Sequence, residues 1–256
     1  MDGLLLDIDG VLSISWEPIA GSIEAMETFR REGIPVCLIT NTTTHTRAAL
    51  AETLRAAGFD VRPESIVTAV TATAEYLRST HPGAQVFVLS DGDARADLDG
   101  VSLVDAPDAA DVIVLGGASE GFTYAAVNGS FRRLMDGASL VAMHRNLFWK
   151  TADGFELDGG AYVIGLEAAV GVTAVVCGKP ASAYFDAALH VLGITADRAA
   201  MVGDDIVNDV EGARAAGLTG ILVRTGKYRE GDLERGTADV VVDALADVPA
   251  WLGLGG

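Results

Sequence analysis

The chain has 256 residues, half of them apolar, and a formal net charge of -18 at pH 7. This length can bury a full core, as one large domain or as a core with an inserted module. No apolar stretch approaches the length of a membrane span and no basic leader is present, so we expect a cytoplasmic protein. The negative charge argues against nucleic acid and anionic membranes as partners. An anionic substrate would therefore need positive charge supplied locally, by a metal ion and a well-placed lysine.

Short apolar runs alternate with helical patterns along the chain. The first set predicts strands at 4–8 and 36–39, with helices at about 22–33 and 47–57. A second set fills the region from about residue 71 to 174, with strands at 86–89, 112–115 and 140–143 and helices at about 123–135 and 161–170. A third set predicts strands at 174–177, 199–202, 221–223 and 240–242, with helices at 181–192 and 209–216. This alternation predicts an α/β fold with a doubly wound parallel sheet.

Polar residues follow four of the apolar runs, where strands of an open parallel sheet present their ligand-binding ends. The four segments are Asp7-Ile8-Asp9-Gly10, Thr40-Asn41, Lys179 after Val175-Val176-Cys177-Gly178, and Gly203-Asp204-Asp205. We expect all four to converge on one cleft.

The chemistry of these residues indicates a metal-assisted reaction on a phosphate. Asp7 and Asp9 are two apart on a strand end, so their carboxylates should share a side. Such a pair repels by roughly 4 kcal/mol at about 4 Å and an effective dielectric near 20, so it needs a cation or a shared proton. Asp204 adds a third hard oxygen ligand, which suits Mg²⁺ better than zinc. Thr40 and the amides after it can hold phosphate oxygens, and Lys179 supplies a fixed positive charge.

The two cysteines, Cys37 and Cys177, each lie in an apolar run that is typical of a strand. They have neither a CxxC spacing nor a histidine nearby that would complete a zinc site. We expect both to be buried free thiols.

The order of these motifs resembles a known family. Asp-Ile-Asp-Gly-Val-Leu, Ile-Thr-Asn, Cys-Gly-Lys-Pro and Val-Gly-Asp-Asp-Ile-Val-Asn-Asp are similar to the four signatures of haloacid dehalogenase-like hydrolases. The insertion between the second and third signatures looks like the C2-type cap of the NagD-type branch. Within that branch, segments 203–212 and 222–228 look closest to the phospholysine phosphohistidine inorganic pyrophosphate phosphatases. The resemblance implies a Rossmann-like catalytic core of residues 1–70 and 175–256, with an inserted α/β cap of residues 71–174.

The resemblance also implies a phosphatase that works through a covalent aspartyl-phosphate. Asp7 would be the nucleophile, and Asp9 the general acid and base. Thr40 and Asn41 would bind the phosphoryl oxygens of a small phosphorylated substrate. Lys179 would hold Asp7 and the phosphate together.

A Mg²⁺ site is implied at the same place. Asp7 and Asp204 would bind the ion through their carboxylates, and Asp9 through its backbone carbonyl. Asp205 and Asp209 would orient metal-bound waters.

One residue departs from the nearest branch, because the mammalian phosphohistidine-type relatives carry serine at the position of Asp9. Keeping an acid there favours ordinary phosphomonoesters, whose poor leaving groups need a proton donor. Activity on phosphoramidates or pyrophosphate is the alternative, and the physiological substrate stays open. A homodimer through the cap is also left open.

Three other classes compete with a phosphatase. A receiver-type phosphoacceptor also gathers aspartates, a threonine and a lysine around magnesium, but it has a single short domain without a cap. A dinucleotide-binding module would need a GxGxxG after the first strand, which is absent. A binding protein that kept the fold without the activity would not need all the catalytic positions to be occupied by competent residues, as they are here.

Overall fold

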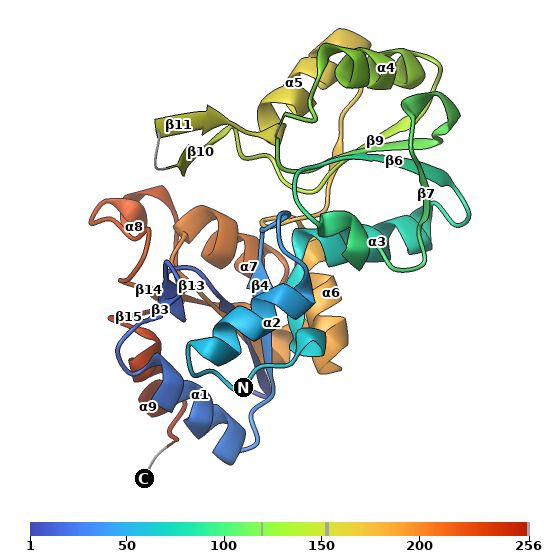
Figure 1. Cartoon of the computed structure of the whole chain (residues 1–256). Coiled ribbons are helices and arrows are strands. Elements are labelled where there is room, and N and C mark those ends of the chain that lie inside the picture. Colours follow the sequence, from blue (N-terminus) through green and yellow to red (C-terminus); the bar gives the residue numbers. More distant parts are fainter. Residues whose placement is uncertain (119, 152–153, 255–256) are drawn as a thin grey trace. The chain divides into compact units, whose positions relative to one another are not determined.

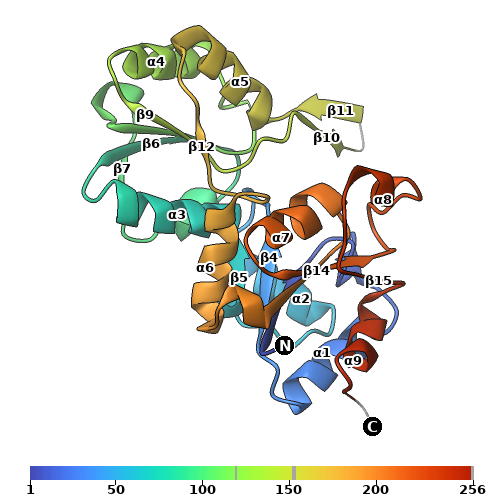
Figure 2. The ribbon, with the colours of Figure 1, turned by 180° about the vertical axis from the view of Figure 1, so that it is seen from behind.

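The computed structural model describes residues 1–118, 120–151 and 154–254. Its internal contacts divide the chain into two compact units, which are considered one at a time. Unit 1 comprises residues 1–40, 47–67 and 179–256, and unit 2 comprises residues 41–46 and 68–178. Figures 1 and 2 show the elements of both units from opposite sides.

Unit 1 is built on a six-stranded sheet. β1 pairs in parallel with β13 on one side and with β4 on the other, and β13–β14 and β14–β15 are also parallel. In sheet order the strands are β15 (Val240–Val242), β14 (Thr219–Val223), β13 (Ala199–Gly203), β1 (Gly3–Asp7), β4 (Val36–Thr40) and β5 (Ile66–Thr68). The α/β class and the parallel sheet predicted from the alternation are confirmed.

Both faces of this sheet are covered, as a doubly wound fold requires. Leu4 and Leu6 of β1 point to one face and share a buried cluster with Phe29. On the other face, Leu222 packs with Ile206. The helices of unit 1 are α1 (Ser22–Arg31), α2 (Arg47–Ala56), α6 (Ser182–Leu192), a π-helical turn (Ile206–Glu211) that runs into α7 (Gly212–Ala215), α8 (Asp232–Arg235) and α9 (Val248–Trp251).

Unit 2 has a five-stranded sheet whose neighbours are all parallel. In order the strands are β12 (Val175–Val176), β9 (Ser139–Ala142), β8 (Val112–Leu115), β6 (Gln85–Leu89) and β7 (Ser102–Val104). Helices α4 (Tyr124–Met135) and α5 (Gly159–Val170) cover one face, and α3 (Ala69–Thr80) lies on the other (Figures 1 and 2). Strands β10 (Phe148–Thr151) and β11 (Gly154–Leu157) form a separate hairpin.

The remaining elements are short. They are the paired strands β2 (Ser13–Ile14) and β3 (Glu17–Pro18) and the 3-10 turns Pro63–Ser65, Ala94–Asp97, Pro107–Ala109, Ala196–Arg198 and Leu245–Asp247. Across the described residues, no helix has the length and apolar character needed to cross a membrane. Cys37 and Cys177 are free and buried, which confirms the prediction for both thiols.

Two segments belong to unit 2 although they flank the core in sequence. The strand at 175–176 was expected with the core elements, but it pairs with β9, so the chain returns to unit 1 only at Lys179. The loop of residues 41–46 is held by hydrogen bonds from Gly117 N to Thr43 Oγ1 at 3.2 Å and from Asp93 N to the Thr44 carbonyl. Unit 2 therefore includes more of the chain than the insertion between the two signatures.

Tyr184 of α6 ties the ends of two core strands together. Its side chain is fully buried, and its hydroxyl accepts a hydrogen bond from Thr40 N at 2.8 Å. The single hydroxyl proton can go to the carbonyl of Thr40 at 2.7 Å or to that of Val67 at 2.8 Å. This phenol therefore fixes the main chain where β4 ends, next to the expected phosphate-binding residues.

Replacing Tyr184 by Phe should weaken the core. The change leaves the buried Thr40 N–H without its acceptor, which costs about 1–3 kcal/mol of unfolding free energy. Denaturant unfolding followed by circular dichroism measures the loss. Tyr124→Phe is the matched control, because Tyr124 is 83% exposed and its hydroxyl should contribute almost nothing. Equal stability of the two variants would show that the Tyr184 hydroxyl does not stabilise the end of β4.

Candidate active site

Three carboxylates are buried together at the carboxyl ends of β1 and β13. Asp7 is the last residue of β1, and Asp204 directly follows β13. Because these two strands are parallel neighbours, with Leu6 opposite Val202, their ends bring the two acids to the same edge. Asp209 joins them from the π-helical turn, and carboxylate oxygens of all three lie within 4.8 Å of one another.

Lys179 neutralises part of this charge. Its Nζ lies 2.8 Å from Asp7 Oδ1 and 2.7 Å from Asp209 Oδ1, and the side chain is buried. Burial alone would lower the pKa of Lys179, but Asp209 and Asp7 outweigh it and raise the pKa above its ordinary value. The ammonium group therefore stays charged.

The two oxygens of Asp7 have different surroundings. Oδ1 accepts a hydrogen bond from Ile8 N at 2.9 Å and contacts Lys179 Nζ. Oδ2 has no hydrogen-bond partner in the described part of the chain. Burial raises the pKa of Asp7, Lys179 opposes the rise, and Asp204 adds to it. Lys179 and Ile8 thus hold Oδ1 alone.

Asp204 has the features of a cation ligand. Its Oδ2 accepts a hydrogen bond from Lys227 N at 2.6 Å, whereas its buried Oδ1 has no hydrogen-bond partner among the described residues. Burial raises the pKa of Asp204 to about 6, and that of Asp209 also to about 6. A hard divalent cation would use the free lone pairs and offset the excess negative charge, so the donor set fits Mg²⁺.

Two glycines let the main chain pack closely around Asp204. Gly10 has a φ of +83°, and a Cβ there would clash with the Asp204 carboxylate. A Cβ on Gly226 would clash with the same carboxylate and with Gly10 Cα. Thr225 closes the contact, because its Oγ1 donates a hydrogen bond to the carbonyl of Gly10.

Asp205 and Asp209, which were expected to play the same supporting role, differ in position. Asp205 caps the π-helical turn, since its Oδ1 accepts hydrogen bonds from Val207 N and Asn208 N at 3.0 Å each. Burial raises the pKa of Asp205, but the Asn208 hydrogen bonds outweigh it, and the net shift is downward. Asp209 lies inside the carboxylate cluster, and its Oδ2 also accepts a hydrogen bond from Asp205 N.

The other expected site residues are Asp9, Thr40 and Asn41, and they differ in burial and in the unit to which they belong. Asp9 is exposed, in a turn where Gly10 N donates to the Ser13 carbonyl. Thr40 is buried at the end of β4, held by Tyr184. Asn41 follows it in the chain but belongs to unit 2. The structure thus brings Asp7, Lys179, Asp204 and Asp209 into direct contact or close approach.

Lys227 is a site residue that the sequence reasoning did not assign. Partial burial lowers its pKa, but Asp7, Asp204 and Asp209 together raise it above its ordinary value. The chain has only three lysines, and two of them lie beside these acids. That scarcity in so acidic a chain is the signal that could have singled it out.

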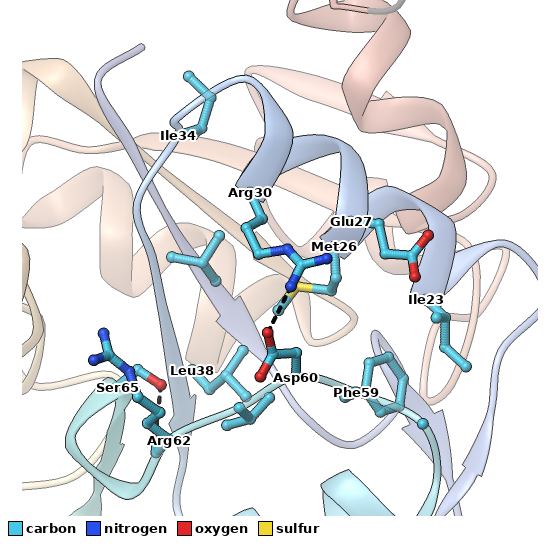
Figure 3. A pocket seen from close by; sticks show the side chains of 13 residues that line it. Ile23, Met26, Glu27, Arg30, Ile34, Leu38, Phe59, Asp60, Arg62 and Ser65 are labelled. Atoms are coloured by element: carbon cyan, nitrogen blue, oxygen red, sulfur yellow. Dashed lines mark hydrogen bonds and ion pairs between the residues drawn. The ribbon is translucent and has the colours of Figure 1, made fainter.

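Described residues of unit 1 line two cavities of several hundred cubic ångströms. One of about 350 Å³ adjoins the carboxylate cluster and is lined by Asp204, Asp205, Asn208, Lys227, Arg229 and Arg235, among others. The other, of about 390 Å³, lies between α1 and residues 58–65, where Arg30 pairs with Asp60 at 2.7 Å (Figure 3). None of the expected catalytic residues lines the second cavity.

Comparisons with known proteins identify the family. A profile described as haloacid dehalogenase-like hydrolase matches residues 4–103, and one described as HAD-hydrolase-like matches residues 176–248. Human haloacid dehalogenase-like hydrolase domain-containing protein 2 is 37% identical over 235 residues, covering 92% of this chain and 88% of that protein. The chain belongs to the haloacid dehalogenase-like hydrolase family. Rat phospholysine phosphohistidine inorganic pyrophosphate phosphatase is 35% identical over 253 residues, covering 96% of this hydrolase and 92% of the rat protein.

Solved structures place this hydrolase among NagD-type proteins, as the resemblance implied. The p-nitrophenyl phosphatase from Archaeoglobus fulgidus is 29% identical, with a TM-score of 0.90 and 98% of each chain covered. NagD from E. coli is 25% identical, with a TM-score of 0.87 and coverage of 96% of this chain and 98% of NagD. The glycerol phosphate phosphatase Rv1692 from Mycobacterium tuberculosis, solved in complex with magnesium, is 27% identical, with a TM-score of 0.85 and coverage of 95% of this chain and 76% of that chain.

The raised pKa values predict how pH affects the stability of the metal-free hydrolase. Asp204 and Asp209 hold protons more tightly in the folded chain than in the unfolded chain, where a carboxyl pKa is about 3.9. Their contribution to stability is therefore present below about pH 4 and is lost as the pH rises through about 6. Because a bound cation relieves the repulsion, excess MgCl2 should raise Tm more at about pH 7.5 than at about pH 5.

Thermal unfolding with EDTA or excess MgCl2 at both pH values tests this expectation. Asp204→Asn removes one carboxylate and should reduce the magnesium-induced rise in Tm at the higher pH. Asp186→Asn is the control, because Asp186 lies exposed on α6 and its variant should respond like the wild type. A magnesium effect that is independent of pH, or is retained in full by Asp204→Asn, would contradict the role of these carboxylates.

Proposed function

We propose that this hydrolase is a magnesium-dependent phosphatase that acts on small phosphomonoesters through an aspartyl-phosphate on Asp7. The observation that carries the proposal is the buried Asp7 carboxylate, held through Oδ1 by Lys179 and left free at Oδ2. The relatives that are named as phosphatases support the reaction class. A cytoplasmic location and a homodimer remain predictions from the sequence.

In the first half of the proposed reaction, Asp7 Oδ2 attacks the phosphorus atom. The new O–P bond forms as the P–O bond to the leaving group breaks, and the leaving oxygen keeps the electron pair. The Asp9 carboxyl donates its proton to that oxygen, so an alcohol departs. The exposure of Asp9, in contrast to buried Asp7, suits a group that must meet the departing part of the substrate.

In the second half, water attacks the phosphorus of the aspartyl-phosphate. Asp9, now ionised, takes the proton from this water, and the bond between phosphorus and Asp7 breaks. Inorganic phosphate leaves, and both aspartates return to their starting states. One acid thus donates a proton in the first step and accepts one in the second.

Charge is the main obstacle to this chemistry, because a carboxylate must approach a dianionic phosphate. Lys179 provides one fixed positive charge beside the attacking group. Mg²⁺ held by the Asp7 and Asp204 carboxylates and the Asp9 main-chain carbonyl would neutralise phosphoryl oxygens as charge develops on them. Asp209 would keep Lys179 in place and, with Asp205, orient water bound to the metal. Thr40 and Asn41 would bind the phosphoryl oxygens.

Cleavage of phosphoramidates or pyrophosphate is the second candidate. It is favoured by the 35% identity to the rat phospholysine phosphohistidine inorganic pyrophosphate phosphatase. Asp9 favours monoesters instead, because an alkoxide is a poor leaving group and gains most from a proton donor. A protein that only accepts or binds phosphate would not turn over either class of substrate.

Removing the two acids should have distinct effects on turnover. Asp7→Asn should abolish phosphate release with Mg²⁺ present, since an amide cannot form the acyl phosphate. Asp9→Asn should lower kcat on ethyl phosphate by about 10² to 10⁴. It should lower kcat/KM for p-nitrophenyl phosphate, which reports phosphoryl transfer to Asp7, by much less, because that leaving group needs no proton. Its kcat should fall for both esters, because loss of the base slows the second half of the reaction, which they share. Release of inorganic phosphate, measured with and without EDTA, gives these rates.

Asp186→Asn again serves as the control for an acid-to-amide change on the surface. An Asp9→Asn variant that hydrolyses both esters at wild-type rates would refute the proton-transfer role. A substrate panel with pyrophosphate and phospholysine in addition to these esters decides between the two candidate substrate classes.

A further inference from the structure

The cavity beside Asp204 has an unusual set of charges. Lys227 and Arg229 line it, yet neither side chain forms an ion pair with any described residue. Arg235, the third cation, is already paired with Asp232 Oδ1 at 3.1 Å. Two cationic side chains therefore face a space of about 350 Å³ without a protein anion bound to them.

The contact of residue 227 with Asp204 is made by its main chain and does not involve its side chain. Lys227 N donates a hydrogen bond to Asp204 Oδ2, which any residue other than proline could do. The ammonium group is not required for this contact. It is available to balance the acids or to bind part of a ligand.

The position of Lys227 relative to the proton donor indicates which part of a ligand it would meet. Residues 225–227 pack directly on the turn that carries Asp9: Thr225 Oγ1 donates to the Gly10 carbonyl, and Gly226 touches Gly10. Asp9 is the proposed proton donor to the leaving oxygen. A group attached to that oxygen would thus lie near Lys227 and the adjoining cavity.

We propose that Lys227, with Arg229, binds an anionic group on the leaving part of the substrate. The preferred substrates are then phosphate esters whose alcohol carries a carboxylate or a second phosphate, and this selection is made by the core unit itself. The inference rests on the proposed phosphatase function. It adds a specificity-determining role for Lys227. If Lys227 only balanced the charge of the acids, its loss would affect the hydrolysis of all esters equally.

Three esters with a two-carbon alcohol test the proposal. Ethyl phosphate has no second charge, phosphoglycolate carries a carboxylate, and ethylene glycol bisphosphate carries a second phosphate. Lys227→Met should lower kcat/KM for one or both charged esters about 10- to 100-fold more than for ethyl phosphate, as expected for a lost hydrogen bond to a charged group. Lys227→Arg should retain most of the preference. The charged ester whose kcat/KM falls more shows whether Lys227 binds a carboxylate or a second phosphate.

Arg224→Met is the matched control, because it removes a positive charge from the same segment, where Arg224 pairs with Asp243 at 2.9 Å. It should leave the ratios between esters unchanged. An equal loss on all three esters in Lys227→Met, or no loss on any, would overturn the proposal.

A binding measurement separates this proposal from the proposed function. Calorimetric titration of the three esters into Asp7→Asn protein, with and without Lys227→Met, reports affinity without turnover. If Lys227→Met weakens binding of the charged esters only, the result supports the role of Lys227 even if the wild type releases no phosphate. Absence of phosphate release would then count against the proposed phosphatase function and not against the binding role of Lys227. Equal affinity of the three esters for the Asp7→Asn protein would overturn the proposal.

Discussion

The site depends on a charge imbalance that burial makes costly. Asp7, Asp204 and Asp209 bring three negative charges together, and Lys179, which contacts Asp7 and Asp209, brings a single positive charge. Buried like charges of this kind are tolerated only with a proton or a cation to offset them. Burial raises the pKa values of all three acids, and repulsion from a neighbouring acid adds a smaller increase to each. Much of the local structure can be understood as a way to hold this cluster.

The topology of unit 1 produces the cluster. β1 lies between β13 and β4, so the chain leaves β1 toward one side of the sheet and later returns on the other. Ligand sites of open parallel sheets form where the strand order reverses in this way. Asp7 thus has Asp204 on one side and Thr40 on the other. Gly10 and Gly226 then allow the surrounding turns to approach Asp204 without side-chain clashes.

Much of this could be predicted from the sequence, because strand ends have a simple signature. A polar residue after an apolar run is easy to recognise, and parallel strands carry such residues to one edge. This is why the positions of Asp7, Lys179 and Asp204 were foreseen. Direct contact between Asp209 and Lys179 was not, since it depends on how a π-helical turn positions one side chain.

Other features depend on contacts between segments that no local pattern reports. In the sequence Tyr184 is typical of the apolar face of a helix, and nothing there indicates that its hydroxyl accepts a hydrogen bond from Thr40 N. Strand 175–176 could join either sheet on its sequence alone, and hydrogen bonding to β9 decides the matter. Lys227 follows an apolar strand by four residues, too far for its place beside Asp204 to be inferred.

The loop of residues 41–46 has a consequence for modular exchange between relatives. It lies outside the insertion in sequence, but Thr43 accepts a hydrogen bond from Gly117, and Gly92 fits against Thr44 where a Cβ would clash. A chimaera that received only a foreign insertion would keep a loop fitted to the lost residues. Unit 2 would then have to be transplanted as two pieces, residues 41–46 together with 68–178, while the intervening helix α2 stayed with the recipient. The segment that follows Thr40 is thus inherited with unit 2 and not with β4, the strand that it directly follows.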